Sequence, residues 1–396
     1  MIAVEEAKNI ILNSTQDFGV EEIPFLKSVG RILKEAVFAD SDFPPFNRVA
    51  MDGIAINFQQ FKNGQREFKI EGIQAAGSEQ ISLKNSENCI EIMTGAVLSE
   101  NTNAVIRYED LEINNGFATI LQEGICDAQN VHSKGKDKKQ GDILIHKNII
   151  ISAAEIGVFA TVGKSKVLVA KQPKVLIIST GDELVEVDEI PLPHQIRRSN
   201  VFTLVSLLER LHIEAETAHI SDEKSVLKVK IEGYLKEFDV LLFSGAVSKG
   251  KFDFLPEVFE ELGVQKLFHQ VAQRPGKPFF YGKTDSCNVF GFPGNPISTF
   301  VNCLVYFYPW FYKSVGLQIK EETAILSENV NFKPNLTYFL QVKLENKFGQ
   351  LVAVPILGNG SGDLASLVNA DGFIELPKSK SEFKKGEFYT LIRYRN

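Results

Sequence analysis

The chain has 396 residues, of which 44% are apolar, and its formal net charge is −7. This length allows two or more domains, and the negative charge argues against nucleic acid as the main partner. The four cysteines and six histidines are scattered without metal-ligand spacing, so neither a disulfide framework nor a Cys/His metal site is predicted.

The first 43 residues are expected to form an N-terminal helical and extended segment. Apolar residues at helical spacing predict a helix at Val4–Leu12, and a second helix is expected at Leu26–Ala36. The first eight residues already include Glu5 and Glu6, which do not fit a secretion signal, so a cytoplasmic location is predicted.

Between Glu67 and Leu121 the pattern predicts a small β-rich module. Its short apolar runs are separated by Gly, Asn and Ser residues. The expected strands are Phe68–Ile73, Cys89–Met93, Ala104–Tyr108 and Phe117–Leu121. After a charged stretch that is expected to be a loop, Ser152–Val162 is predicted to be a helix that begins with a capping box.

The middle of the chain, from Gln172 to Val315, alternates strand and helix patterns. This alternation predicts a doubly wound, mostly parallel α/β sheet covered by helices on both faces. Buried strands are expected at Val175–Ile178, Val240–Phe243 and Asn288–Gly291. Helices are expected at Val201–His212 with Asn200 as N-cap, at Glu223–Phe238 and at Ile297–Tyr312.

The helix expected at Ile297–Tyr312 is apolar nearly all round, which predicts burial in the domain or at a subunit interface. It is shorter than the roughly 20 residues that span a bilayer, so no membrane segment is expected. From about Gly316 strand patterns return and predict a C-terminal β domain. Its expected strands are Thr337–Leu344, Leu351–Ile356, Phe373–Leu376 and Phe388–Tyr394.

Three loops that follow predicted strands combine glycine with polar residues: Ser179–Glu183, Ser244–Asp253 and Gly291–Ser298. The carboxyl ends of parallel strands are where α/β sheets bind ligands. Glycine allows close approach of the backbone, and free amides before a helix favour anions. A single loop of this kind is more often a simple turn with no ligand. Three such loops at one edge of the sheet predict a binding site.

The segment Arg274–Pro278 has the sequence RPGKP, in which two prolines and a glycine stiffen a loop that carries two cations. A rigid cationic loop suits a phosphate or another oxyanion. Acidic residues occur in other glycine-bearing loops, and carboxylates beside cations around an oligo-anion are typical of a Mg²⁺ site. These acids are Asp52, Asp137, Asp182, Glu183 and Asp253, although their spacing alone does not select them.

Eight motifs occur in order along the chain. They are PPFNRVAMDGIA (Pro44–Ala55), IMTGA (Ile92–Ala96), GKD (Gly135–Asp137), TGDEL (Thr180–Leu184), SGAVSKGKFD (Ser244–Asp253), RPGKP (Arg274–Pro278), GFPGNPIS (Gly291–Ser298) and GNGSGDLASLVNADGF (Gly358–Phe373). On these motifs nearly the whole chain resembles the molybdopterin molybdenumtransferase family, the bacterial relatives of the gephyrin E domain. Any one motif is weak evidence, but their order is specific.

The resemblance implies a chain of four domains that forms an elongated homodimer with a shared active-site cleft. The implied domains are a linker domain of residues 1–43 and 141–171, a β-rich module of residues 44–140, an α/β domain of residues 172–316 and a C-terminal β domain of residues 317–396. The implied reaction inserts molybdate, a substrate, into adenylylated molybdopterin with Mg²⁺ as cofactor and with release of AMP. A molybdopterin adenylyltransferase would then be the partner that hands over the substrate.

The resemblance also implies site residues. The implied catalytic residues are Asp52, Thr94, Asp137, Glu183 and Asp253, of which Glu183 and Asp253 are expected to hold Mg²⁺ or polarise the nucleophile. The implied substrate-binding residues are Gly181, Ser248, Gly250, Arg274, Lys277, Pro293, Gly294, Pro296 and Ser361. Asp52 and Asp137 are expected to close the site from the other subunit, and Asp182 is expected to cap the turn that follows it.

Some positions depart from the family pattern: Val49, Ile54, Ala246, Arg198, Arg274 and Gln341. Because the core acids are retained, these departures bear on substrate affinity more than on reaction type. Two alternatives stay open at this point. One is a molybdopterin adenylyltransferase, which makes the adenylylated pterin, and the other is a non-catalytic pterin-binding carrier or scaffold.

Overall fold

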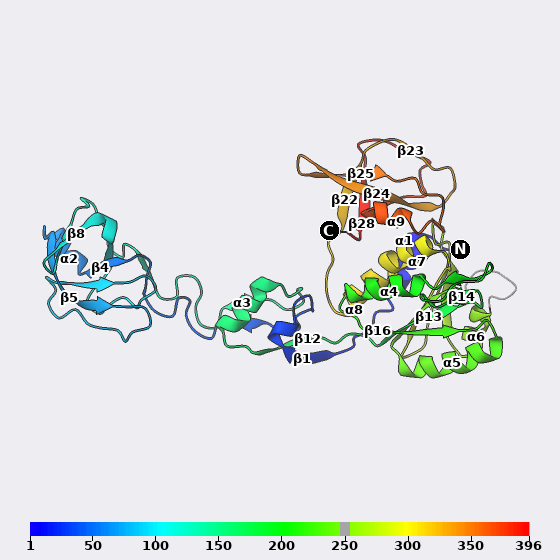
Figure 1. The fold of residues 1–396 in the computed structure, drawn as a ribbon, viewed down its shortest axis with the longest axis horizontal. Helices are drawn as coiled ribbons and strands as arrows, with labels where there is room; N and C mark the ends of the chain where they lie inside the picture. Colours follow the sequence, from blue (N-terminus) through cyan, green and yellow to red (C-terminus); the bar gives the residue numbers. More distant parts are fainter. Residues whose placement is uncertain (246–253, 396) are drawn as a thin grey trace. The chain divides into compact units, whose positions relative to one another are not determined.

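The computed structural model describes residues 1–245 and 254–395 (Figure 1). The chain separates into two compact units, each discontinuous in sequence. The first unit contains Met1–Lys34, Asn148–Ala153 and Lys166–Asn396, and the second contains Glu35–Lys147 and Ala154–Ser165. In the part of the chain that the structure describes, no helix has the length and apolar character needed to cross a membrane.

A six-stranded sheet forms the centre of the first unit, with the order β16-β13-β17-β21-β20-β18. The first four strands are parallel to one another, whereas β20 pairs antiparallel with β21 and β18 pairs antiparallel with β20. This arrangement confirms the predicted α/β class, with a mixed edge. In chain order the strands are β13 (Val175–Thr180), β16 (Ala215–Ile220), β17 (Val240–Ser244), β18 (Gln265–Gln270), β20 (Pro278–Lys283) and β21 (Asn288–Phe292).

Helices cover both faces of this sheet, and β13 shows why. Val175 and Ile177 join an apolar cluster with α1, α4 and α7, whereas Leu176 and Ile178 join another with α5 and α6. Successive strand side chains point to opposite faces, so one continuous apolar run fills two cores. The helices are α1 (Val4–Leu12), α4 (Asn200–Glu209), α5 (Lys224–Glu237), α6 (Leu255–Glu261) and α7 (Pro296–Asn302).

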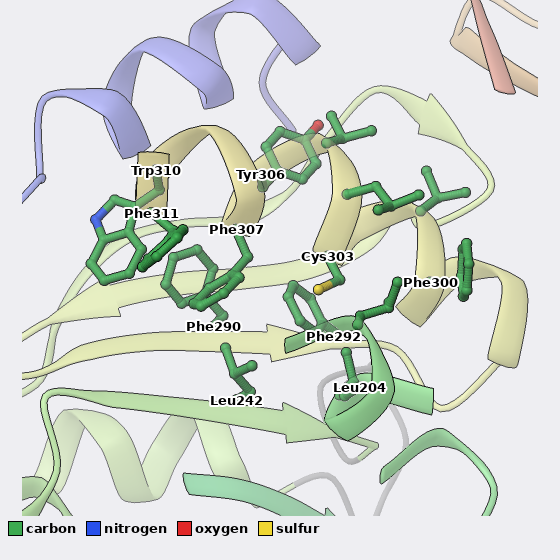
Figure 2. Packing of buried hydrophobic residues seen from close by; sticks show 14 of the residues in the cluster. Leu204, Leu242, Phe290, Phe292, Phe300, Cys303, Tyr306, Phe307, Trp310 and Phe311 are labelled. Atoms are coloured by element: carbon green, nitrogen blue, oxygen red, sulfur yellow. The ribbon is translucent and has the colours of Figure 1, made fainter. Parts of the chain in front are cut away.

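The predicted buried helix after β21 is confirmed, and its middle turn is wider than an α-helix. α7 is followed by a π-helical turn, η3 (Cys303–Phe307), and by α8 (Tyr308–Ser314). Its aromatic side chains pack on the sheet around Phe290 (Figure 2). Phe290 is fully buried, with ring centroids 5.6 Å from Phe307 and 5.6 Å from Trp310.

The C-terminal part of the first unit is a β-barrel. β24 pairs with β25 and β26, while β22 and β28 complete the circle. A short strand, β19 (Gln273–Arg274), runs from the α/β sheet to pair with β24 and joins the two layers. The other elements are β22 (Glu322–Leu326), β23 (Val330–Asn331), β24 (Thr337–Lys347), β25 (Gln350–Pro355), α9 (Ser366–Asn369), β26 (Gly372–Leu376), β27 (Glu382–Phe383) and β28 (Phe388–Arg393).

The second unit contains the predicted β-rich module. Its six-stranded sheet has the order β7-β4-β6-β5-β9-β8 and includes all four expected strands. The strands are β4 (Gly53–Ile56), β5 (Glu67–Gln74), β6 (Cys89–Ile92), β7 (Ala104–Arg107), β8 (Leu111–Asn114) and β9 (Phe117–Ile120). Smaller elements are β2 (Val37–Phe38), β3 (Arg48–Val49), α2 (Phe58–Lys62), η2 (Tyr108–Asp110), β10 (Val131–His132) and β11 (Ile143–Ile145); α3 (Ala153–Thr161) confirms the helix expected after Ser152.

The prediction of a helix at Leu26–Ala36 is wrong. A short 3₁₀ helix, η1 (Phe25–Lys27), is followed by Gly30 at φ +82° and by an extended segment. There Leu33 pairs with Val169 beside the β-ribbon of β1 (Val20–Pro24) and β12 (Lys166–Ala170). Backbone pairing with these distant segments overrides the local helical spacing.

We expect Phe290→Ala to lower the free energy of unfolding by about 3–5 kcal/mol, because it empties the centre of the aromatic cluster. Urea unfolding measures this loss. Phe348→Ala is the matched control, since Phe348 is fully exposed and its removal leaves no cavity. Equal stability of the two variants would contradict the assigned packing.

Candidate functional site

A cavity of about 720 Å³ lies between the α/β sheet and the C-terminal barrel. It is lined by the RPGKP loop, by the turn before α7, by β24 and by the loop before α9. The predicted site residues that it brings together are Glu183, Arg274, Lys277, Pro293, Gly294 and Ser361. These residues come from four different motifs.

Arg274 and Lys277 of the RPGKP loop line this cavity, and buried side chains contact the loop backbone on its other side. Arg274 and Lys277 are exposed, whereas Gly276 between them is buried. Gly276 has φ +88°, and a Cβ there would lie 2.5 Å from Asn302 Oδ1. A larger residue would therefore displace the loop from its support.

The support is a buried polar network formed by Gln273, Asn302 and Tyr306. Gln273 Nε2 donates to Pro275 O at 2.9 Å and to Asn302 Oδ1 at 2.8 Å, and its Oε1 accepts from the Tyr306 hydroxyl. Gln273 and Asn302 are fully buried. Burial raises the pKa of Tyr306 well above its ordinary value, so the hydroxyl stays protonated and can donate. The network fixes the loop that carries the two cations.

Ser361 is tied to the turn before α7, although 66 residues separate it from Asn295. Asn295 Nδ2 donates to Ser361 Oγ at 3.0 Å, and the amide of Ile297 donates to Ser361 O at 3.1 Å. Thr299 Oγ1 donates to Pro293 O at 2.5 Å and closes the turn from inside. The barrel and the α/β domain therefore share this wall of the cavity.

A second cavity of about 320 Å³ lies at the carboxyl ends of β13 and β17. β13 pairs with β16 on one side and β17 on the other, so the chain reverses its winding direction here. Such a switch point is the usual ligand site of doubly wound sheets. The two cavities share lining residues, namely Glu183, Ile196, Gly294 and Asn295, while Gly181 and Pro296 line the second.

Gly181 at the end of β13 has a left-handed backbone conformation that favours glycine, and the Glu183 carboxylate lies beside it. Gly181 has φ +132°, and a Cβ there would lie 2.5 Å from Glu183 Oε2. Glu183 is followed by β14 (Leu184–Val185), which pairs with β15 (Ile196–Arg197). The small ribbon holds Glu183 where it lines both cavities.

Two local predictions around this cavity are wrong. Asn200 was expected to cap α4, but it is the first helical residue, and its Nδ2 donates to Ser244 Oγ at 2.9 Å and Gly294 O at 2.7 Å. Asp182 was expected to cap the turn that follows it, but its Oδ1 accepts from the amide of Asp222 at 3.3 Å. Both side chains bridge separate loops, and sequence reasoning missed Asn200 as a site residue because Asn before an apolar helix ordinarily predicts a cap.

Three predicted catalytic residues lie in the second unit. Thr94 N donates to Asp52 Oδ1 at 2.6 Å. Hydrogen bonds from the backbone and side chain of Thr94 lower the pKa of Asp52, which favours its ionised form. Asp137 Oδ1 lies 2.9 Å from His132 Nε2. Ser248, Gly250 and Asp253, by contrast, lie outside the described residues.

Models of known families match successive parts of the chain. They are described as the MoeA N-terminal region (domain I and II) for residues 2–163, a probable molybdopterin binding domain for residues 176–311 and the MoeA C-terminal region (domain IV) for residues 323–390. A molybdopterin molybdenumtransferase of Synechocystis sp. is 39% identical over 399 residues and covers 100% of both chains. The chain belongs to the molybdopterin molybdenumtransferase family.

Other relatives agree with this assignment. A molybdopterin molybdenumtransferase of Staphylococcus epidermidis is 31% identical over 99% of this chain and 95% of its own. The crystal structure of a molybdopterin biosynthesis MoeA protein from Pyrococcus horikoshii is 31% identical, with a TM-score of 0.85 over 100% of both chains. The family and the fold expected from the eight motifs are therefore confirmed.

We expect Tyr306→Phe to weaken binding of an oxyanion probe such as molybdate by about tenfold, because Gln273 Oε1 loses its buried donor and the cationic loop loses its support. The free energy of unfolding should also fall by about 1–3 kcal/mol. Calorimetric titration and urea unfolding measure the two effects.

Tyr281→Phe is the matched control, since Tyr281 is also fully buried and its hydroxyl donates to Asn288 Oδ1 at 2.8 Å. It should lose similar stability while keeping probe affinity. Unchanged affinity in Tyr306→Phe would show that the network does not position the loop.

Proposed function

We propose that this chain inserts molybdate into adenylylated molybdopterin and releases AMP, as a molybdopterin molybdenumtransferase. The observation that carries the proposal is the pair of joined cavities, in which Glu183 of the TGDEL motif lies near Arg274 and Lys277 of the RPGKP motif. Together the cavities offer cations for oxyanions and a carboxylate beside them. Family membership supports the same reaction.

The first cavity suits the molybdate end of the reaction. Arg274 offers a planar fork of donors and Lys277 a compact positive charge, and both suit a tetrahedral dianion. Ser298 and Ser361 also line this cavity and supply hydroxyl groups. We therefore assign molybdate binding to the cationic loop and phosphate binding to the neighbouring cavity.

Magnesium fits the donor chemistry of the second cavity when it is shared with substrate. Among residues 1–245 and 254–395 no group of three or more His, Cys, Asp or Glu side chains could hold a metal alone. Mg²⁺ is commonly bound by one or two carboxylates together with substrate phosphates. Glu183 and Asp222 line the cavity, so Glu183, with Asp253 as its proposed second ligand, would hold a Mg²⁺ that neutralises phosphate charge.

The second unit would contribute the remaining acids from a partner copy. We propose that Asp52, Thr94 and Asp137 complete the site in a homodimer. The direct bond between Asp52 and Thr94, which belong to different motifs, supports a common role. Delivery of the substrate by a molybdopterin adenylyltransferase and a cytoplasmic location belong to the same proposal.

With adenylylated molybdopterin, molybdate and Mg²⁺, the purified protein should release AMP above a no-protein control. Glu183→Gln should lower the rate about 100-fold or more, since it removes a negative charge and a proton acceptor. Asp253→Asn should behave similarly. The matched control is Asp188→Asn, because Asp188 is an exposed acid on the same segment and lines neither cavity.

Full activity of both Glu183→Gln and Asp253→Asn would exclude them as metal ligands. Release of pyrophosphate from ATP and molybdopterin would instead identify an adenylyltransferase. No AMP release at all would favour a pterin-binding carrier.

Light scattering should give about twice the mass of one 44.2 kDa chain. Mixing inactive Asp52→Asn with inactive Glu183→Gln should then restore up to about a quarter of the activity, because some mixed dimers hold one intact composite site. A monomer, or the absence of complementation between dimers, would reject the shared site.

A further inference from the structure

His132 is a side chain of the second unit that has no place among the expected site residues or in the proposed reaction. It lies in β10, which pairs with β3, and its Nε2 is 2.9 Å from Asp137 Oδ1. An ionised carboxylate can only accept a hydrogen bond, so the imidazole nitrogen opposite it is the donor. The histidine therefore contacts one of the acids that are proposed to complete the site.

The loop that carries Asp137 is fixed through its backbone to the segment around Pro44. The amide of Gly135 donates to Pro44 O at 2.9 Å, and the amide of Asp137 donates to Phe43 O at 2.9 Å. These bonds fix the main chain but leave the Asp137 side chain free to choose among its rotamers. The contact with His132 selects one orientation of the carboxylate.

This contact is selective, because the loop offers other cations to the same acid. Four lysines flank Asp137, and none of them forms an ion pair within the described part of the chain. The Asp137 and His132 side chains are 55% and 28% exposed, so their pairing adds little to stability and both stay accessible to a ligand. The pairing therefore matters for direction. The four lysines are Lys134, Lys136, Lys138 and Lys139.

Strand β3 connects this pair to the other acid of the second unit. Val49 of β3 exchanges backbone hydrogen bonds with the IMTGA turn, and β3 also pairs with β10. The turn holds Asp52 Oδ1 through the amide of Thr94. β10 holds Asp137 Oδ1 through His132. Each acid is thus fixed at one oxygen by a donor from an element that is bonded to β3.

We propose that His132 is a positioning residue for Asp137. It holds Oδ1 of the carboxylate and leaves Oδ2, which has no hydrogen-bond partner among the described residues, for the substrate. A group that is oriented before the substrate arrives does not have to be ordered during the reaction, which lowers the barrier. The contact itself rests on the geometry, and only the catalytic use of Asp137 rests on the proposed function.

The test compares AMP release by variants of the full-length protein. His132→Ala should lower kcat about 10- to 100-fold while KM changes by less than about threefold, because misplacing a reacting group costs rate more than affinity. His132→Gln should recover most of the rate, since the side-chain amide can donate in place of Nε2. His146→Ala is the matched control, because His146 is an exposed histidine of the same unit.

A double-mutant cycle shows whether His132 acts through Asp137. In the Asp137→Ala background, His132→Ala should lower kcat by less than about twofold further, because the side chain that it positions is already absent. If His132→Ala does not fold, His132→Phe takes its place in the cycle, since it keeps a ring without a donor.

An equal loss of rate in both backgrounds overturns the positioning role, and so does an unchanged kcat in His132→Ala. Both results require an unmodified protein that releases AMP. An unmodified protein that releases none would instead reject the proposed reaction, and the catalytic use of Asp137 with it.

Discussion

Burial of the central sheet on both faces determines where the first unit can place its polar chemistry. The strands β13 and β17 are apolar until their last residues, where Ser179, Thr180 and Ser244 appear. An unpaired polar group on either face would lose its water without compensation. In β13 and β17 the polar side chains are therefore confined to the strand ends, and at the switch point these two ends line one cavity.

The barrel supplies a second wall of the first cavity, and its strand β24 pairs with β19 at the start of the RPGKP loop. Gln273 belongs to both layers, because its backbone pairs with Thr337 of the barrel while its side chain bonds to the loop and to Asn302 of α7. A loop held in this way loses little conformational freedom when an anion binds, so more of the interaction energy remains as affinity. The same reasoning explains why polar residues are tolerated in the otherwise apolar helix after β21: their hydrogen bonds are satisfied by the loop they support.

The elements that the sequence predicts well are those whose signal is local. Val175–Ile178 and the apolar helix after β21 are identified by continuous apolar runs, which have few alternatives in a chain of this composition. The edge strands β16 and β18 were missed, because AETAHI and QKLFHQ contain too few apolar residues to predict burial. Their strand state depends on pairing with a neighbour. Within the candidate site, the motifs predicted Glu183 and Arg274, which line one cavity. The contact of Asn295 with Ser361 and the contacts of Gln273 depend on the fold and have no local signature.

Charge distribution also separates the two cavities chemically. Within the described residues, neither Arg274 nor Lys277 takes part in an ion pair, whereas Arg198 is paired with Glu186. Unpaired cations in a concave site exert a stronger field on a ligand than the same charges spread over a surface. The chain as a whole is acidic, so this positive field is local. It attracts the anionic groups of a ligand to the cavity that Arg274 and Lys277 line. Glu183 lies where the two cavities meet, and its negative charge disfavours an anion at that point. We therefore propose that a substrate with two separated anionic groups would lie along the joined cavities, with one group on each side of Glu183 and of the Mg²⁺ that Glu183 is proposed to hold.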